Sequence, residues 1–233
     1  MKTLIIIPAY NEQESIKNVV NEIYENIDNC DILVVNDGST DNTYNEAIKT
    51  NAKVLNLSNN LGIGGAVQAG YLYAYKNNYD IAIQIDGDGQ HNPKYINDMI
   101  QIISDGQADM VIGSRFVIKT GYKQTFFRML GIKLTSEIIK MFARNKIYDT
   151  TSGMRAINKS IIELFAKSYP YDYPEPCTNM EVILRKKKVK EIPVEIRQRI
   201  TGVSSISPIK SIKYMLKVTL SLFLIRIKKV SKT

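Results

Sequence analysis

Residues 81–91, IAIQIDGDGQH, join a run of apolar residues to a loop of acidic residues and glycines. The run Ile81–Ile85 is typical of a buried strand. Asp86 and Asp88 place two carboxylates directly after it, and Gln90 adds an amide oxygen. Such hard oxygen ligands suit Mg²⁺ or Mn²⁺. A solvated turn is the alternative for an isolated Asp-x-Asp, but the position at the end of a strand favours a metal site.

The same alternation of short apolar runs and amphipathic stretches extends over the first half of the chain. It predicts strands at 3–7, 32–35, 53–57, 81–85 and 108–112, and helices at 12–27, from about 42, at 63–76 and at 94–103. Alternating β and α units of this length predict the α/β class, with a mostly parallel sheet flanked by helices. Ligands bind at the carboxyl ends of strands in such sheets. The loops at 8–12, 36–41, 59–65 and 86–90 are therefore candidate binding loops.

The alternation stops after about residue 114. The later pattern predicts helices at 126–142, 159–167 and 209–229 and a strand at 189–194, with a polar turn at 149–153 and a loop rich in Pro and Tyr at 169–176. No internal repeat and no sharp domain boundary is visible in the sequence.

Composition limits the class of protein. The chain has 233 residues, of which 44% are hydrophobic and 23% charged, so it is neither disordered nor fibrous. Its two cysteines, Cys30 and Cys177, cannot form a disulfide framework or a thiolate zinc site, which favours a reducing compartment. The sequence passes into the first strand without the features of a signal peptide, so we expect a cytoplasmic protein.

The net charge of +8 is concentrated near the C-terminus. Residues 185–233 hold fourteen Lys and Arg side chains against two acidic ones, and the remainder of the chain is mildly acidic. A basic block of this kind indicates a polyanionic partner. In the helix at 209–229, apolar residues recur at helical spacing beside a stripe of lysines.

The uncharged run in that helix, 218–225, is eight residues long, whereas a membrane-spanning helix needs about 20. We therefore expect it to lie in the interface of an anionic membrane, with the protein peripherally associated. Packing on the body of the protein or on a partner subunit, as in a homo-oligomer, is the alternative.

Two further loops point to a nucleotide. Asp37 follows a strand, and capping of the next helix by Ser39, Thr40 or Asp41 leaves its carboxylate free to accept the N–H of a base. The glycine-rich run at 60–66 is a poor match to a dinucleotide-binding motif, because Val67 occupies the position of the third glycine. Close packing of a helix N-terminus beside a nucleotide, at Gly64, is the better interpretation.

Together these motifs resemble family 2 glycosyltransferases, which are inverting enzymes with the GT-A fold. The motifs occur in the family's order: Pro8-Ala9-Tyr10-Asn11-Glu12, Asn36-Asp37-Gly38-Ser39-Thr40-Asp41, Asn60-x-Gly62-x-Gly64-x-Ala66, Asp86-x-Asp88-x-Gln90-His91 and Gly113-Ser114-Arg115. Two later motifs are similar to the dolichol-phosphate mannose synthase and polyprenyl-phosphate glycosyltransferase branch: Thr151-Ser152-Gly153-Met154-Arg155 and Arg199-x-x-Gly202-x-Ser204.

The resemblance implies an activity and a domain organisation. Residues 1–205 would form a GT-A catalytic domain, with the nucleotide sugar in 1–114 and the acceptor in 115–205, followed by a basic amphipathic helix at 206–233. The enzyme would move a sugar from a UDP- or GDP-linked donor to a polyprenyl phosphate at the cytoplasmic membrane face. The alternative acceptor is a hydroxyl group in cell-surface polysaccharide or glycolipid synthesis.

The resemblance also implies roles for individual residues. The nucleoside would be held by Pro8, Tyr10 and Glu12, and its base by Asp37. The divalent metal on the donor diphosphate would be held by Asp86, Asp88 and Gln90. Donor and acceptor phosphates would be bound by Arg115, Arg128 and Arg199, so that Asp88, Arg115 and Arg128 are the predicted catalytic residues. Asn36 departs from the family pattern, which has Asp there, and this leaves the base preference open.

Rival interpretations explain less. His91 is the only histidine, and we expect it to brace the metal loop or to touch a phosphate rather than act as a base. A hydroxyl acceptor would need a carboxylate base, for which the candidates are Asp149, Asp172, Glu175 and Glu181. A nucleic-acid-binding protein would account for the basic tail but not for the Asp-x-Asp loop, so we expect no nucleic-acid partner.

Overall fold

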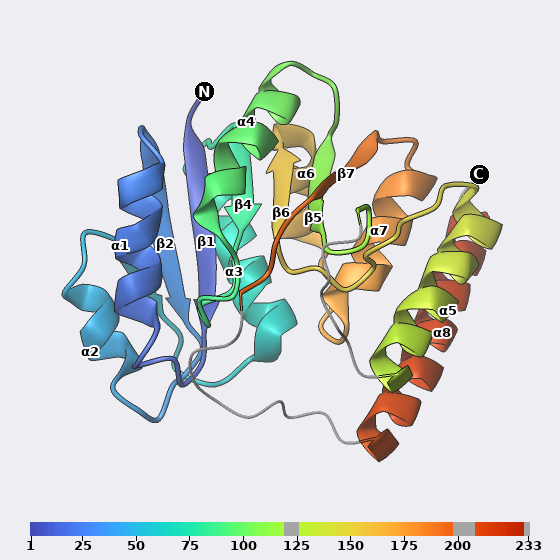
Figure 1. Ribbon diagram of the computed structural model, residues 1–233, viewed down its shortest axis with the longest axis horizontal. Coiled ribbons are helices and arrows are strands. Elements are labelled where there is room, and N and C mark those ends of the chain that lie inside the picture. Colours follow the sequence, from blue (N-terminus) through green and yellow to red (C-terminus); the bar gives the residue numbers. More distant parts are fainter. Residues whose placement is uncertain (119–125, 198–207, 231–233) are drawn as a thin grey trace.

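Seven strands form one sheet in the computed structural model, and helices cover both of its faces (Figure 1). The structure describes residues 1–118, 126–197 and 208–230. In chain order the strands are β1 (Thr3–Ala9), β2 (Cys30–Asn36), β3 (Lys53–Asn56), β4 (Ile81–Gln84), β5 (Met110–Ser114), β6 (Arg155–Asn158) and β7 (Val189–Pro193). The helices are α1 (Ile16–Asn26), α2 (Thr43–Ile48), α3 (Gly62–Lys76), α4 (Ile96–Ser104), α5 (Phe126–Ala143), α6 (Lys159–Lys167), α7 (Pro174–Leu184) and α8 (Pro208–Val230), with a 3₁₀ turn, η1, at Pro93–Tyr95.

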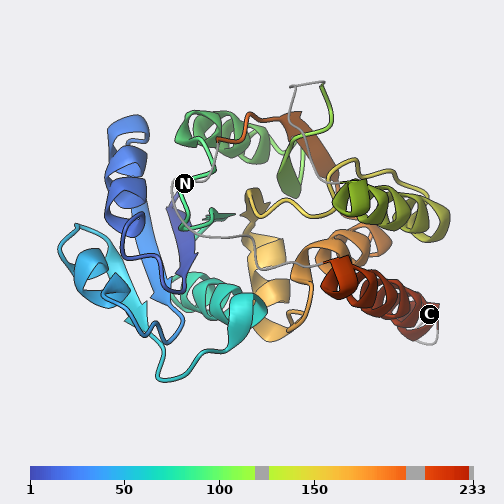
Figure 2. The same cartoon turned by 60° about the horizontal axis from the view of Figure 1, so that its bottom comes forward.

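The sheet is parallel except at one strand. Its order is β3-β2-β1-β4-β6-β5-β7, and β6 runs antiparallel to both of its neighbours, β4 and β5. The ladders β1–β2, β1–β4, β2–β3 and β5–β7 are all parallel. The parallel strands therefore end at one edge of the sheet, which Figure 2 brings forward.

Each face of the sheet has its own core because successive strand residues point to opposite sides. Ile5 and Ile7 of β1 pack with α1 and α4, whereas Leu4 and Ile6 pack with α3, α6 and α7. β1 is buried along its whole length. The sequence of β1 is a continuous apolar run because the strand lies near the centre of the sheet and helices cover it on both faces.

Most of the predicted elements are present, with two additions. The sequence pattern predicts a turn before residue 155 and no strand after it, whereas β6 is present and joins the two parts of the sheet. It also predicts a loop up to residue 176, whereas α7 begins at Pro174. Proline is compatible with the first turn of a helix, where the backbone N–H groups have no partner within the helix.

The α5 and α8 helices lie side by side at the end of the molecule beyond β5 and β7 (Figures 1 and 2). Val218 and Leu222 of α8 are fully buried in this contact, and the rings of Phe142 and Phe223 meet with centroids 6.0 Å apart. Of the helices that the structure describes, none is long and apolar enough to cross a bilayer.

The packing of α3 on β1 requires a glycine, which gives a test of the fold. A Cβ added at Gly70 would lie 2.3 Å from Cγ2 of Ile6. Since overpacking a core costs about 1–3 kcal/mol, we expect Gly70→Ala to lower the free energy of unfolding, measured by urea denaturation, by that amount. The matched control is Gly131→Ala in α5, where the nearest atom, Cγ of Met215, is 3.4 Å away. This variant should gain about 0.5–1 kcal/mol from helix propensity. Equal shifts in the two variants would contradict the packing described.

Candidate active site

The loops after β1, β2, β4 and β5 meet at the edge of the sheet where the parallel strands end. The N–H of Asp37 donates to the carbonyl of Ala9 at 2.9 Å, so the loops after β1 and β2 are in contact. Side chains strengthen this contact: Asn11 accepts from the N–H of Thr40 at 2.9 Å, and Ser39 Oγ accepts from the N–H of Asn11 at 3.0 Å. The loops after β1 and β2 therefore form one surface.

Three of the predicted nucleoside-binding residues lie at the end of β1 and in the loop that follows it. Pro8 is buried at the end of β1, and the ring of Tyr10 is exposed. Glu12 is fixed at two points: its N–H donates to Thr43 Oγ1 at 2.7 Å, and its Oε2 accepts from Ser15 Oγ at 2.9 Å. These bonds place the side chains at the rim of the site but do not test their roles.

Asp37 is more enclosed than the capping interpretation predicts. Its side chain is buried, and Oδ1 accepts the N–H of Leu61 at 2.7 Å, at the start of α3. Burial raises the pKa of Asp37, while the N–H groups of Leu61 and Gly62 act in the opposite direction. Asp41 accepts the N–H of Thr43, the first residue of α2, at 2.9 Å. A role for Asp37 toward a base stays a prediction.

Two other positions in these loops are explained by contacts within the protein. Asn36, which stands where the family pattern has Asp, is buried and donates from Nδ2 to Asn56 Oδ1 at 2.6 Å. Gly64 lies against the backbone of the segment 169–173, because an added Cβ would be 2.5 Å from the carbonyl oxygen of Pro170 and 2.3 Å from that of Tyr171. The nucleotide-binding role of Gly64 likewise stays a prediction.

The predicted metal loop, 86–91, is held by hydrogen bonds within the chain. Asp88 Oδ1 accepts the N–H of Gln90 at 3.0 Å, and Gln90 Nε2 donates to the carbonyl of Arg197 at 3.3 Å. His91 is buried, and its Nδ1 accepts the N–H of Asp86 at 3.2 Å. The ring thus braces the loop, as the sequence predicts.

Gly153, at the turn before β6, lies against the Asp86 carboxylate. A Cβ added at Gly153 would lie 2.6 Å from Asp86 Oδ2 and 2.7 Å from Oδ1. Only glycine allows this approach. The sequence gives one signal for this role, which is the place of Gly153 in the motif at 151–155.

The donor set of the loop suits a hard divalent cation, although it is incomplete by itself. Asp86 and Asp88 supply carboxylate oxygens, and Gln90 carries an amide oxygen. Within the described residues, no group of three or more His, Cys, Asp or Glu side chains is placed to hold a metal ion. Mg²⁺ is commonly held by one or two carboxylates together with substrate phosphates and water. The loop fits that arrangement.

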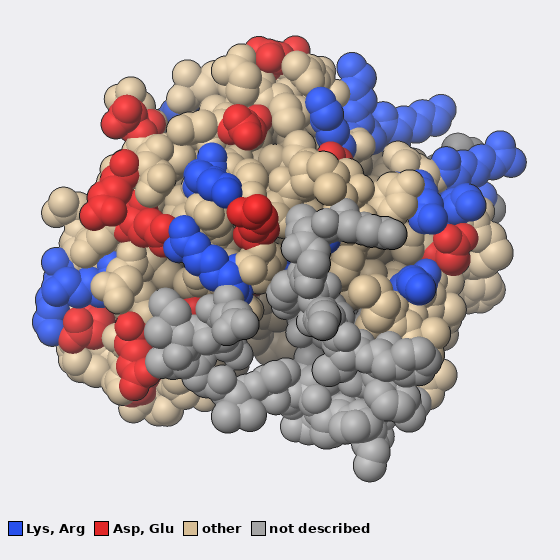
Figure 3. Space-filling model, in the orientation of Figure 1, with Lys and Arg blue, Asp and Glu red and all other residues tan. Residues whose placement is uncertain are grey.

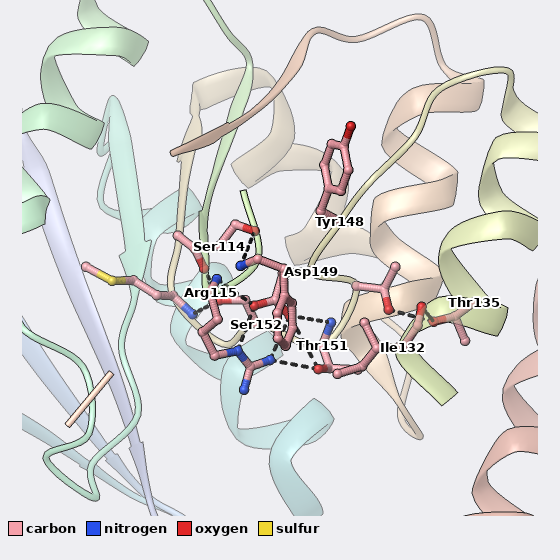
Figure 4. A network of polar contacts seen from close by, with 12 residues as sticks. Ser114, Arg115, Ile132, Thr135, Tyr148, Asp149, Thr151 and Ser152 are labelled. Carbon is pink, nitrogen blue, oxygen red and sulfur yellow. Dashed lines mark hydrogen bonds and ion pairs between the residues drawn. The ribbon is translucent and has the colours of Figure 1, made fainter. Parts of the chain in front are cut away.

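Arg115 is held in a buried ion pair with Asp149 (Figure 4). Its Nε donates to Asp149 Oδ2 and its Nη2 to Oδ1, both at 2.7 Å, and its backbone N–H adds a bond of 3.0 Å to Oδ2. Nη2 also donates to Thr151 Oγ1 at 2.9 Å. The side chains are 8% and 0% exposed. Asp149 therefore fixes the orientation of the guanidinium at the end of β5.

Glu191 of β7 fixes Asp149 in turn. Its carboxylate accepts the N–H of Tyr148 at 2.7 Å and that of Asp149 at 2.8 Å. Burial raises the pKa of Glu191, and these two N–H groups act in the opposite direction. The sequence pattern does not reveal this relay, because its members lie 34 and 42 residues apart.

The structure does not describe the other two predicted phosphate-binding arginines. Arg128 belongs to α5, but its side chain lies outside the described part, and Arg199 lies in the undescribed range 198–207. The structure consequently brings together the loops of Glu12, Asp37, Asp86 and Arg115 and leaves the predicted grouping of the three arginines untested.

Comparison with known proteins gives three findings. Residues 4–165 match the model of the family described as Glycosyl transferase family 2. A UDP-N-acetylglucosamine–dolichyl-phosphate N-acetylglucosaminyltransferase of Methanococcus voltae is 33% identical over 212 residues, which cover 82% of this chain and 84% of the relative. A polyprenol monophosphomannose synthase of Mycolicibacterium smegmatis is 29% identical over 217 residues, covering 88% and 81%.

The structural comparison concerns the fold. Glucosyl-3-phosphoglycerate synthase from Mycobacterium tuberculosis, crystallised with Mn²⁺, UDP and phosphoglyceric acid, superposes with a TM-score of 0.70 at 16% identity. The match covers 97% of this chain and 78% of that one. It confirms the predicted α/β fold of the GT-A type.

The pair Arg115–Asp149 gives a test of the site's framework. Asp149→Asn removes one charge of a buried pair and leaves the other uncompensated, which costs about 3–5 kcal/mol. We expect a loss of this size in the free energy of unfolding, measured by urea denaturation at neutral pH. The control is Glu137→Gln, which affects exposed pairs with Lys140 and Lys146 and should change stability by at most about 1 kcal/mol. A loss at Asp149 no larger than that of the control would argue against the buried pair.

Proposed function

Because the chain belongs to glycosyl transferase family 2, we propose that it transfers a sugar, with inversion, from a UDP- or GDP-linked donor to a polyprenyl phosphate. The observation that carries the proposal is the Asp86–Asp88 loop at the end of β4, with Gly153 packed against Asp86. The names of the relatives from M. voltae and M. smegmatis, which state a dolichyl phosphate and a polyprenol monophosphomannose, support a lipid phosphate as the acceptor.

In this proposal the loops after β1 and β2 bind the nucleoside. Asp37 stands at the end of β2, fixed by the N–H of Leu61, and presents its carboxylate to the base. Tyr10 has an exposed ring that can stack on the nucleoside, and Glu12 is placed for the ribose hydroxyls. Asn36 donates to Asn56 and carries no charge. These loops can therefore accept a donor whose base is either uracil or guanine.

The donor diphosphate binds at the metal loop. Asp86, Asp88 and Gln90 would hold Mg²⁺ or Mn²⁺, which supplies a Lewis acid that offsets the charge developing on the leaving diphosphate. His91 keeps the loop in place through the N–H of Asp86. Gly153 keeps the Asp86 carboxylate against the turn before β6.

The acceptor phosphate needs cations rather than a base, because it is already an oxyanion near neutral pH. Arginine forks suit phosphate oxygens, and Arg115, Arg128 and Arg199 are the proposed set. Asp149 and Thr151 orient Arg115 at the end of β5, and correct alignment of the acceptor with the anomeric carbon lowers the barrier.

For two of the four candidate bases, Asp149 and Glu181, the contacts favour a phosphate acceptor over a hydroxyl acceptor. Both oxygens of Asp149 accept from Arg115, which leaves this carboxylate poorly suited to remove a proton. Glu181 pairs with Arg185 at 2.8 Å. Asp172 and Glu175 belong to the segment that leads into α7 and its first turn.

The experiment that tests the function is a transfer assay. The full chain is incubated with UDP- and GDP-sugars, Mn²⁺ or Mg²⁺, and a polyprenyl phosphate, and labelled sugar is followed into the lipid phase. A parallel reaction with the free polyprenol tests a hydroxyl acceptor. Transfer to the alcohol alone would overturn the lipid-phosphate proposal.

We predict that Asp88→Ala abolishes this transfer, because the remaining oxygens cannot hold a cation that bridges the diphosphate. The matched control is Asp98→Ala, at an exposed position of α4, which should transfer at the wild-type rate. Addition of EDTA to the wild type should have the same effect as Asp88→Ala. Full activity of Asp88→Ala, or of the wild type in EDTA, contradicts the metal role.

We also propose peripheral association with an anionic membrane surface through α8. Val218 and Leu222 face the body of the protein, while Leu216, Leu220 and Leu224 are 68%, 59% and 55% exposed. Lys217 is exposed on the same helix. A helix that keeps an apolar row and basic side chains in solvent fits the interface between headgroups and acyl chains.

The prediction uses substitutions that spare the buried face of α8. The triple variant Leu216→Gln, Leu220→Gln, Leu224→Gln should lose most of the binding to anionic liposomes in a sedimentation assay, while its melting temperature stays near the wild-type value. Ile48→Gln in α2, also exposed, is the control. If liposome binding is unchanged and the variant instead loses an oligomer seen by light scattering, the row is a subunit contact.

A further inference from the structure

The segment that follows β7, residues 194–197, crosses the sheet to reach the predicted metal loop. We call this segment the strap. β7 is an edge strand, and β5 and β6 separate it from β4 in the order of the sheet. Figure 1 shows the chain leaving β7 and passing in front of these two strands. The strap begins at the end of β5, because Val194 is buried and donates its N–H to the carbonyl of Ser114 at 3.0 Å.

The strap joins the metal loop through three contacts. Ile196 forms an isolated antiparallel bridge with His91. The N–H of Arg197 donates to the carbonyl of Gln90 at 2.9 Å, and Nε2 of Gln90 donates to the carbonyl of Arg197 at 3.3 Å. The far end of the strap is therefore bonded to the same residue whose amide is assigned to the metal.

The bond from Gln90 to Arg197 decides how the Gln90 amide is turned. A backbone carbonyl only accepts hydrogen bonds, so the end of the amide that faces Arg197 must be its NH₂ group. The opposite end is then Oε1. Hard divalent cations take oxygen ligands, and the strap thus holds the amide in the orientation in which Gln90 can serve as a ligand.

Two ion pairs hold the strap to the helices beside the metal loop. Nη1 of Arg197 lies 2.7 Å from Oε1 and 2.8 Å from Oε2 of Glu22, in α1. Glu195 pairs with Lys94, at the 3₁₀ turn η1, at 2.9 Å. Figure 3 shows acidic and basic side chains side by side on this face, over α1 and α4. Because partly exposed pairs contribute little to global stability, loss of one should loosen the strap without unfolding the chain.

We propose that Arg197 is a positioning residue of the donor site. Its pair with Glu22 holds the strap against the metal loop, and its carbonyl keeps Oε1 of Gln90 available to the cation. The inference rests on the proposed function, since it takes Gln90, with Asp86 and Asp88, as a ligand of the donor's metal.

The test measures binding of UDP and of GDP to the full chain by titration calorimetry, with and without Mn²⁺, together with the melting temperature. Arg197→Met removes the guanidinium and keeps the backbone bonds. We expect it to weaken the Mn²⁺-dependent part of nucleotide binding about three- to fivefold, with little change in binding without Mn²⁺ or in melting temperature. The matched control is Arg185→Met, which removes a pair with Glu181 of similar length and exposure and should bind as the wild type does.

Reversal of the pair separates its charge from the shape of the side chains. Glu22→Arg alone should weaken Mn²⁺-dependent binding at least as much as Arg197→Met does, because two cations then face each other. Combined with Arg197→Glu, it restores an ion pair, and binding should return to within about twofold of the wild-type value. If Arg197→Met lowers the melting temperature strongly, this rescue decides the question.

A double-mutant cycle tests whether Arg197 acts through Gln90. In the Gln90→Ala background the amide is absent, so Arg197→Met should cause no further loss of Mn²⁺-dependent binding. Losses that add in the double variant would show that Arg197 acts by another route, which overturns the inference.

The remaining outcomes separate the inference from the proposed function. A folded Arg197→Met variant with wild-type Mn²⁺-dependent binding overturns the inference and leaves the proposed function intact. Equal losses with and without Mn²⁺ also overturn it, because they indicate a general disturbance of the nucleotide site. A wild-type chain whose nucleotide binding does not respond to Mn²⁺ overturns the proposed metal site and this inference with it.

Discussion

The pairing of β6 with both β4 and β5 is the constraint on which the rest of the structure depends. β4 closes the parallel part of the sheet that carries the proposed nucleotide-binding loops, and β5 with β7 forms the other part. Only β6, running antiparallel, joins them. The turn before β6 carries Gly153 to Asp86, and the segment leading to that turn carries Asp149 to Arg115. One four-residue strand thus brings the proposed donor loop and the proposed acceptor arginine to the same edge of the sheet.

The site is built around ionic groups that are withdrawn from water. Asp149 accepts two short bonds from the Arg115 side chain, whereas Nη2 of Arg155 is buried without a hydrogen-bond partner among the described residues. The first arrangement satisfies its hydrogen bonds and orients a side chain. The second leaves a buried guanidinium on β6, the strand next to β4, with its hydrogen bonds incomplete. Both cost desolvation free energy, which is consistent with selection for the properties of the site rather than for stability alone.

Local patterns in the sequence predicted the parallel half of the fold and the loops that form the site. Apolar runs such as Thr3–Ile7 have a periodicity that depends only on neighbours, and the motif residues follow them directly. β6 was missed because its four residues include a buried arginine and an asparagine, and α7 because Pro174 and Pro176 resemble a loop. The partnership of Arg115 with Asp149 could not be predicted, since it joins residues that become neighbours only when β6 enters the sheet. The predicted arginine set stays a prediction at Arg128 and Arg199.

The order of the strands also has a consequence for synthesis on the ribosome. When β4 emerges, one of its edges pairs with β1, but the strand for its other edge is still about 70 residues from being made. At typical rates of translation this interval lasts on the order of 10 s. During that time the nascent chain presents an open edge of apolar β-strand, the kind of surface that recruits other strands into aggregates. Early covering of this edge, by helices of the chain or by a chaperone, would then govern the yield of folded protein. The stability of the finished fold would matter less for that yield.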